Sequence, residues 1–160
     1  MPRIGITGHS SLPGDTAQRV GDALRDALSG CADDKLVGMT CLARGADQVF
    51  ARVVLELGGD VEVVLPAADY RERKVKPDNA AEFDELLARA DVVHTMPAPV
   101  SNREAYLAAG TYVLAHVEEL VAVWDGAPPD GTGGTGDTVR IAREQGLPVT
   151  VVWPEGARRG

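Results

Sequence analysis

The chain alternates six times between a short apolar run and an amphipathic segment, and this alternation leaves few folds open to it. The apolar runs are rich in β-branched residues and mostly lack a strict two-residue period, which is typical of strands covered on both faces. We therefore predict six strands, over residues 3–7, 35–42, 61–65, 91–96, 120–124 and 148–153.

The segments between these runs carry apolar residues at helical spacing. Stripes of this kind predict helices around residues 20–28, 46–54 and 83–90, and further helices over 104–117 and 135–145. Gly146 is a suitable residue to follow the last helix, and Pro148 prevents its continuation. Repeated strand–helix alternation indicates right-handed crossovers, hence an α/β, doubly wound, mostly parallel Rossmann-like sheet.

The expected strand order is 3-2-1-4-5-6, in which ligands bind beyond the carboxyl ends of the strands, between the first and fourth strands. A length of 160 residues with 44% apolar content is enough for one well-buried core. We expect one nucleotide-binding domain over residues 1–156 and a frayed tail over 157–160, whose arginines are solvated.

The net charge of −8 repels phosphate backbones, so nucleic acid is disfavoured as a partner and a small ligand is favoured. No apolar run reaches the length of a membrane span and no secretory leader is recognisable, which predicts a cytoplasmic protein without membrane contact. Cys31 and Cys41 are isolated and are expected to be reduced thiols. His9, His94 and His116 lack ligand spacing, so we expect no metal site and no cofactor.

The stretch "WDGAPPDGTGGTGD", residues 124–137, follows the fifth predicted strand and opens a helix. Glycine lets the backbone approach a ligand, and a helix start aims free N–H groups at an anion. This loop is either a phosphate cradle, which we favour, or a flexible turn capped by Thr135. The residues assigned to ligand binding here are Asp125, Gly126, Gly133, Gly134 and Thr135.

The loops after the first two strands offer further candidates. Gly8 and His9 follow the first strand and could face a ribose or phosphate, or form a tight turn. In "CLARGAD", Arg44 suits bidentate phosphate binding or a surface ion pair, Gly45 lies beside it, and Asp47 either functions or caps a helix.

The one basic cluster lies in the loop after the third strand, which is long for a strand-to-helix connection. It is a candidate lid over an anionic ligand, although a solvated run of charges is the commoner case. The residues of this candidate lid are Tyr70, Arg71, Arg73, Lys74 and Lys76.

The segments "GITGHSSL", "CLARGADQVFA", "EFDELLARA" and the stretch from "VAVWDG" to "VTVVWP" together resemble the SLOG superfamily. This resemblance spans nearly the whole chain. It implies a Rossmann-like nucleotide-binding fold, related to the lonely-guy (LOG, "lysine decarboxylase-like") phosphoribohydrolases and to a recombination mediator that binds single-stranded DNA. It also leaves a homodimer open.

Three functions follow from the resemblance and the residues. The first is a sensor or carrier that binds a nucleotide-type small molecule. The second is a phosphoribohydrolase that cleaves the N-glycosidic bond of a nucleoside 5′-monophosphate, with Asp137 as the catalytic carboxylate and Tyr106 or Arg103 near the ligand. Lonely-guy enzymes carry Glu where this chain has Asp137, and the loss of about 1.5 Å of reach favours binding over hydrolysis. The third is single-stranded nucleic-acid binding by the loop from Arg71 to Lys76.

Overall fold

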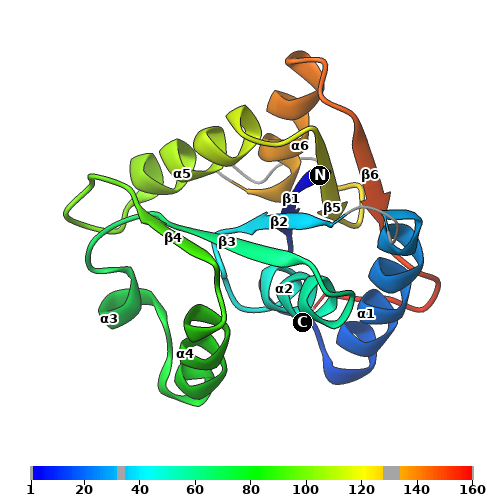
Figure 1. Cartoon of the computed structure of the whole chain (residues 1–160), viewed down its shortest axis with the longest axis horizontal. Helices are drawn as coiled ribbons and strands as arrows, with labels where there is room; N and C mark the ends of the chain where they lie inside the picture. The colour runs from blue at the N-terminus through cyan, green and yellow to red at the C-terminus, as the bar shows by residue number, and fades with distance from the viewer. Residues whose placement is uncertain (1, 32–34, 128–133, 160) are drawn as a thin grey trace.

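The structure is a computed structural model that describes residues 2–31, 35–127 and 134–159. Six strands form one sheet, and every neighbouring pair is parallel, so the predicted doubly wound, Rossmann-like α/β fold is confirmed (Figure 1). The strands are β1 (Arg3–Gly8), β2 (Val37–Thr40), β3 (Asp60–Leu65), β4 (Val92–Thr95), β5 (Glu119–Val123) and β6 (Val149–Val152).

The strand order is β4-β3-β2-β1-β5-β6, so the predicted order 3-2-1-4-5-6 is wrong. The first four strands run in succession toward one edge, because β4 pairs with β3 and not with β1. The chain then returns across the sheet and lays β5 beside β1, with Gly8 in register with Val123. The topological switch point therefore lies between the first and fifth strands, where a ligand crevice is expected.

Helices cover both faces of the sheet, and the crossover direction decides which face each one takes (Figure 1). Strands β1 to β4 are joined by α1 (Gly14–Leu28), α2 (Ala46–Glu56), the short α3 (Tyr70–Lys74), the 3-10 turn η2 (Pro77–Asn79) and α4 (Ala80–Ala88). The reversal after β4 places α5 (Arg103–Ala115) and α6 (Thr135–Glu144) on the opposite face. A second 3-10 turn, η1 (Ser29–Cys31), follows α1. Sequence periodicity predicted the five longer helices but not α3 or the 3-10 turns.

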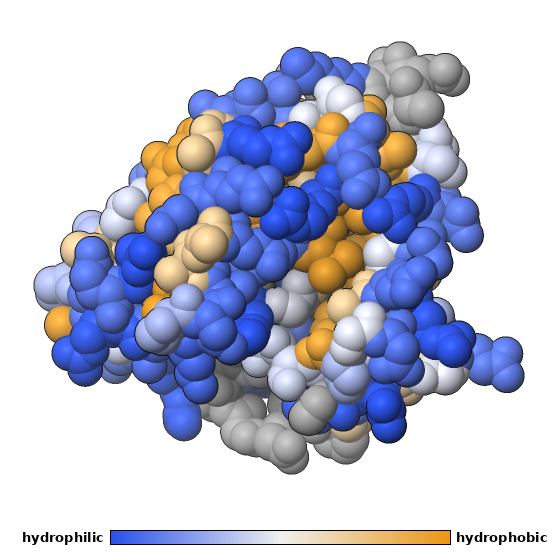
Figure 2. Space-filling view, turned by 90° about the horizontal axis from the view of Figure 1, so that it is seen from below, coloured by the Kyte–Doolittle hydropathy of each residue, from blue (hydrophilic) through white to orange (hydrophobic). Residues whose placement is uncertain are grey.

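The main apolar core lies between the sheet and the α1–α2–α4 layer, with Leu24, Phe50 and Phe83 fully enclosed. A smaller cluster lies under α5, around Met39 and Val113. Seen from below, from the side of α1 and α4, the surface is mostly hydrophilic, and apolar residues show in a hollow near its centre (Figure 2).

Strand β4 departs from the expectation that both faces of every strand are covered. All four of its residues are exposed, and Val92 and Val93 keep 49% and 46% of their surface. Because β4 is an edge strand and α5 crosses away from it toward β5, its apolar composition does not reflect burial. That prediction is wrong for this strand.

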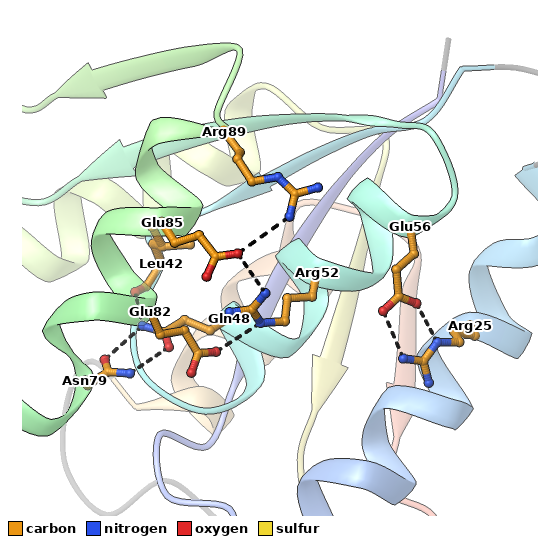
Figure 3. Close-up of polar contacts among 9 residues, drawn as sticks. All are labelled: Arg25, Leu42, Gln48, Arg52, Glu56, Asn79, Glu82, Glu85 and Arg89. Atoms are coloured by element: carbon orange, nitrogen blue, oxygen red, sulfur yellow. Dashed lines mark hydrogen bonds and ion pairs between the residues drawn. The ribbon is translucent and has the colours of Figure 1, made fainter.

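Ion pairs join the helices of the α1–α2–α4 layer at the surface (Figure 3). Glu56 at the end of α2 accepts two hydrogen bonds from Arg25 of α1. Arg52, one turn earlier on α2, reaches Glu82 and Glu85 of α4 at 3.2 and 3.5 Å. These pairs are largely exposed, so each contributes little to stability alone. The apolar core holds the helices together, and the ion pairs help to set their relative orientation. Among the described residues no helix is long and apolar enough to cross a membrane.

Close packing of α2 against β2 predicts opposite effects for two Gly→Ala substitutions. A Cβ at Gly38 would lie 2.8 Å from both Phe50 Cε1 and Val54 Cγ2, whereas one at Gly110 of α5 would meet no atom of the described residues within 4 Å. We expect Gly38→Ala to lower the free energy of unfolding by roughly 1–3 kcal/mol through overpacking. Gly110→Ala should raise it by up to about 1 kcal/mol, through helix propensity. Urea denaturation measures both; equal effects would contradict the packing described.

Candidate functional site

A cleft of about 1130 Å³ opens at the carboxyl edge of the sheet, where β1 and β5 diverge. Its walls come from the loops after β1, β2 and β5, from the region between α3 and α4, and from Tyr106 of α5. The register that pairs Gly8 with Val123 brings His9, the residue after β1, close to Asp125, two residues after the end of β5, at the mouth of the cleft. Such a cavity is large enough for a mononucleotide.

Two of the glycines assigned to ligand binding are required by the packing of the protein itself. Gly45 has a φ of +88°, and a Cβ there would lie 2.6 Å from the carbonyl oxygen of His9 and 2.7 Å from that of Ser10. The amide of Ala46 donates a hydrogen bond to His9 O at 3.2 Å, so the loops after β1 and β2 touch backbone to backbone. A Cβ at Gly8 would collide with Ala46 and Val123. Both glycines line the cleft, but their conformation and packing already explain their presence.

His9 lies at the centre of this junction with only 8% of its surface exposed. Its Nε2 accepts a hydrogen bond from the amide of Asp125 at 3.2 Å, and Trp153 packs edge-on against its ring. Burial lowers the pKa of His9, and the charge of Arg159 lowers it further. The ring is therefore neutral near pH 7, and because Nε2 accepts, the proton lies on Nδ1.

Asp125 presents a charged carboxylate beside His9. Its Oδ1 accepts the amide N–H of Ala127 at 3.0 Å and lies 3.4 Å from His9 Nε2. The hydrogen bond from Ala127 and the nearby charge of Arg159 hold the pKa of Asp125 below its ordinary value. An ionised carboxylate at this place suits the hydroxyl groups of a sugar and would repel a phosphate.

The N-terminus of α6 forms another part of the wall, with Gly134, Thr135 and Gly136 lining the cleft. Gly134 is the N-cap residue, and a Cβ there would meet no atom of the described residues within 4 Å. No side chain of Gly134 therefore stands between the cleft and the free N–H groups of the first turn. Gly126 has a φ of +84°, which explains a glycine at that turn. The candidate Gly133 lies outside the described residues.

The structure distributes the basic candidates among different environments. Arg44 lines the cleft but forms a two-point ion pair with Asp78, with nitrogen–oxygen distances of 3.2 and 2.9 Å. Tyr70 is buried in the core against Phe83. The remaining members of the candidate lid lie in three environments. Arg71 binds Asp84, Lys74 and Lys76 line the cleft, and Arg73 is exposed on α3.

Two buried amides anchor the η2–α4 side of the cleft (Figure 3). Gln48 of α2 and Asn79 of η2 donate to each other at 3.0 and 2.9 Å, and Gln48 also donates to Leu42 O. These reciprocal bonds hold η2 against α2 and so position Lys76 and Asp78 at the cleft. Sequence reasoning missed this pair, because neither amide belongs to a recognisable motif.

Asp47 occupies the first turn of α2 and lines the cleft, with 8% of its surface exposed. Its Oδ2 accepts the amide of Ala43 at 3.3 Å, which closes the turn after β2. Burial raises the pKa of its carboxyl to about 7, although hydrogen bonds from Ala43, Thr40 and Cys41 act in the opposite direction. A carboxyl group that changes charge near neutral pH in a cleft is typical of functional sites. This favours a functional role for Asp47 over helix capping, the other role that the sequence predicts for it.

Asp137, the candidate catalytic carboxylate, is placed differently. Gly136 and Thr138 on either side of it line the cleft, whereas Asp137 is not among the described residues that do so. Its side chain is 12% exposed and accepts a hydrogen bond from Arg140 at 3.2 Å. The carboxylate is thus bonded to a side chain of its own helix.

Comparisons with known proteins detect a likeness only at the level of structure: no protein-family profile and no curated protein matches the sequence. The structure of DNA processing protein A (DprA) from Streptococcus pneumoniae superposes with a TM-score of 0.71 at 17% identity, covering 98% of this chain and 52% of that one. The chain thus spans about half the length of that protein.

Two further structures show the same arrangement. DprA from Helicobacter pylori, described with its single-stranded DNA binding mode, gives a TM-score of 0.66 at 16% identity, covering 99% of this chain and 68% of that one. The molybdenum cofactor (Moco) carrier protein of Chlamydomonas reinhardtii gives 0.55 at 16% identity, covering 94% and 74%. These likenesses show a shared Rossmann-like fold, in agreement with the SLOG resemblance of the motifs.

Asp47 gives the stability of the protein a pH dependence that a single substitution should remove. The carboxyl holds its proton up to about pH 7 in the folded state, against an ordinary value of 3.8. The stabilising contribution of Asp47 is complete below pH 3.8, the ordinary pKa. It is lost as the pH rises through about 7, the pKa in the folded protein. Between about pH 5 and pH 7 we expect the wild type to lose roughly 2–3 kcal/mol relative to Asp47→Asn, measured by urea denaturation at each pH. Parallel curves for the two proteins would contradict this.

Proposed function

We propose that the protein binds a nucleotide or a nucleotide-derived small molecule in the cleft between β1 and β5, as a sensor or carrier. The observation that carries the proposal is the start of α6. This helix begins at the cleft with Gly134, where the described part of the chain leaves space for a ligand to approach the backbone. A helix N-terminus at the switch point of a parallel sheet suits a phosphate.

The other walls supply partners for the rest of such a ligand. Asp125 is an ionised acceptor for sugar hydroxyls, and Tyr106 and Trp124 add aromatic surface at the cleft. His9, with its proton on Nδ1, holds the backbone of Asp125 in place. Of the proteins with the same fold, one is named as a cofactor carrier, so this scaffold is compatible with small-ligand transport.

Hydrolysis of the N-glycosidic bond is the weaker candidate. It requires a carboxylate placed accurately against the sugar, and Asp137 is instead bonded to Arg140 within its own helix. Binding of single-stranded nucleic acid is suggested by the H. pylori protein, but here the net charge is −8. Arg44 and Arg71 are also both paired with aspartates.

Nucleotide binding is tested by thermal unfolding with 5′-AMP and the other nucleoside monophosphates. At a concentration about 100-fold above Kd, a ligand should stabilise the protein by about 2.7 kcal/mol and raise Tm by roughly 5–10 °C. Gly134→Val should abolish this shift, because the side chain fills the open space at the helix start. Gly14→Val is a matched control, since Gly14 also starts a helix in open space but is not among the described residues that line the cleft. A full shift with Gly134→Val would refute the phosphate position.

A chromatographic assay for free base separates binding from hydrolysis. We expect no base to be released from any nucleoside monophosphate, because Asp137 is bonded to Arg140 and is not among the described residues that line the cleft. Release by the wild type that Asp137→Asn abolishes would instead establish the phosphoribohydrolase. Binding that persists in about 0.5 M salt would exclude a nucleic-acid site, whose affinity falls steeply with salt.

A further inference from the structure

The segment after β6 begins at the carboxyl edge of the sheet, on the same side of the molecule as the cleft. Residues 154–159, here called the strap, turn at Gly156, where φ is +84°, and Ala157 donates to Pro154 O. Arg19 of α1 donates to Glu155 O at 3.3 Å. The amide of Arg158 then donates to Thr16 Oγ1 at 3.1 Å, and Thr16 is fully buried at the start of α1. The strap is therefore attached to α1 at two points.

The two consecutive arginines of the strap diverge. Arg158 lies 3.8 Å from Asp15 at the surface, with 71% of its side chain exposed. Arg159 lies 3.6 Å from Asp125 Oδ2 and lines the cleft together with His9. The attachment of the Arg158 backbone to Thr16 thus directs only the second arginine to the ligand site.

The pair between Arg159 and Asp125 is loose enough to be exchanged. Its nitrogen–oxygen distance is 3.6 Å and half of the Arg159 side chain is exposed, so the pair adds little to the stability of the fold. Arg44 differs, because Asp78 already occupies both ends of its guanidinium group. A planar guanidinium group binds a phosphate monoester through two parallel hydrogen bonds, which a single long contact to a carboxylate does not match.

We propose that Arg159, delivered by the strap, is a ligand-binding residue that exchanges Asp125 for the phosphate of a nucleoside monophosphate. Asp125 is then released to accept a hydrogen bond from the sugar. This inference rests on the proposed function and adds to it the side chain that recognises the anionic group.

Titration calorimetry with 5′-AMP and with adenosine tests this role. Arg159→Ala should weaken AMP binding about tenfold, the effect of losing one charged hydrogen-bonding partner, and should leave adenosine binding unchanged. Arg158→Ala is the matched control and should bind AMP within about twofold of the wild type. Arg159→Lys, which keeps the charge but loses the planar fork, should fall between.

The outcomes separate this inference from the proposed function. A wild type that binds no nucleotide would overturn both. Binding by the wild type with an equal Kd for Arg159→Ala would overturn only the role of Arg159. An equal loss for AMP and adenosine would also overturn it, since the residue would then act on the cleft as a whole and not on the phosphate.

The position of the strap has an independent readout in the unliganded protein. Because the charge of Arg159 helps to lower the pKa of His9, Arg159→Ala should raise that pKa and Arg158→Ala should not. An NMR titration of the His9 ring measures it. An unchanged titration in Arg159→Ala would show that the strap does not bring its charge to the cleft, and would refute the proposal.

Discussion

The cleft depends on a contact between two loops that have no side chain between them. At Gly45 the turn after β2 lies against the carbonyl groups of His9 and Ser10, closer than any Cβ would permit. This approach places the start of α2 beside the end of β1, and the next residue, Ala46, bonds to His9 O. His9 is thereby fixed where its ring can hold the backbone of Asp125 across the switch point. Backbone packing at one edge thus determines the geometry of the whole site.

Around that junction, burial and neighbouring groups determine which carboxyl groups are ionised. Asp47 lies deep, where desolvation favours its neutral form, whereas Asp125 lies nearer the surface with an amide and an arginine that favour its ionised form. Two carboxyl groups in one cleft therefore differ in charge near neutral pH. The carboxyl of Asp47, which changes charge near neutral pH, closes a turn, and the ionised carboxylate of Asp125 is available to a ligand or a counter-ion.

The sequence predicts the architecture well because apolar period and β-branched content report local environment. Six parallel strands and five helices follow from these patterns. The strand order does not, because β4 pairs with β3 through backbone groups that every residue possesses, and its valines resemble those of a covered strand. Length and charge alone also could not show that the basic segment divides between a buried Tyr70, a paired Arg71 and two lysines at the cleft.

The site residues show the same limit. Gly134 and Asp125 are found by the motif around them, and both line the cleft. The motifs also single out Gly8 and Gly45, but the structure explains both glycines by close packing within the protein. Asp137 has the expected residue type and position in the chain, yet its side chain is bonded to Arg140, which no linear pattern reveals. Arg159 lies in a segment without a periodic apolar pattern, and only the fold shows that it lines the cleft together with His9, the residue after β1.

The strap also bears on how the protein acquires its binding capacity. His9 follows the first strand and Arg159 the last, so this part of the pocket joins regions that are remote in sequence. Contacts of such separation form late in folding, because the intervening chain must first be ordered. A partly folded molecule can contain the sheet and both helical layers and still lack the contact that we propose between Arg159 and the phosphate. The full affinity proposed for a phosphate-bearing ligand would then require that the strap has packed against α1.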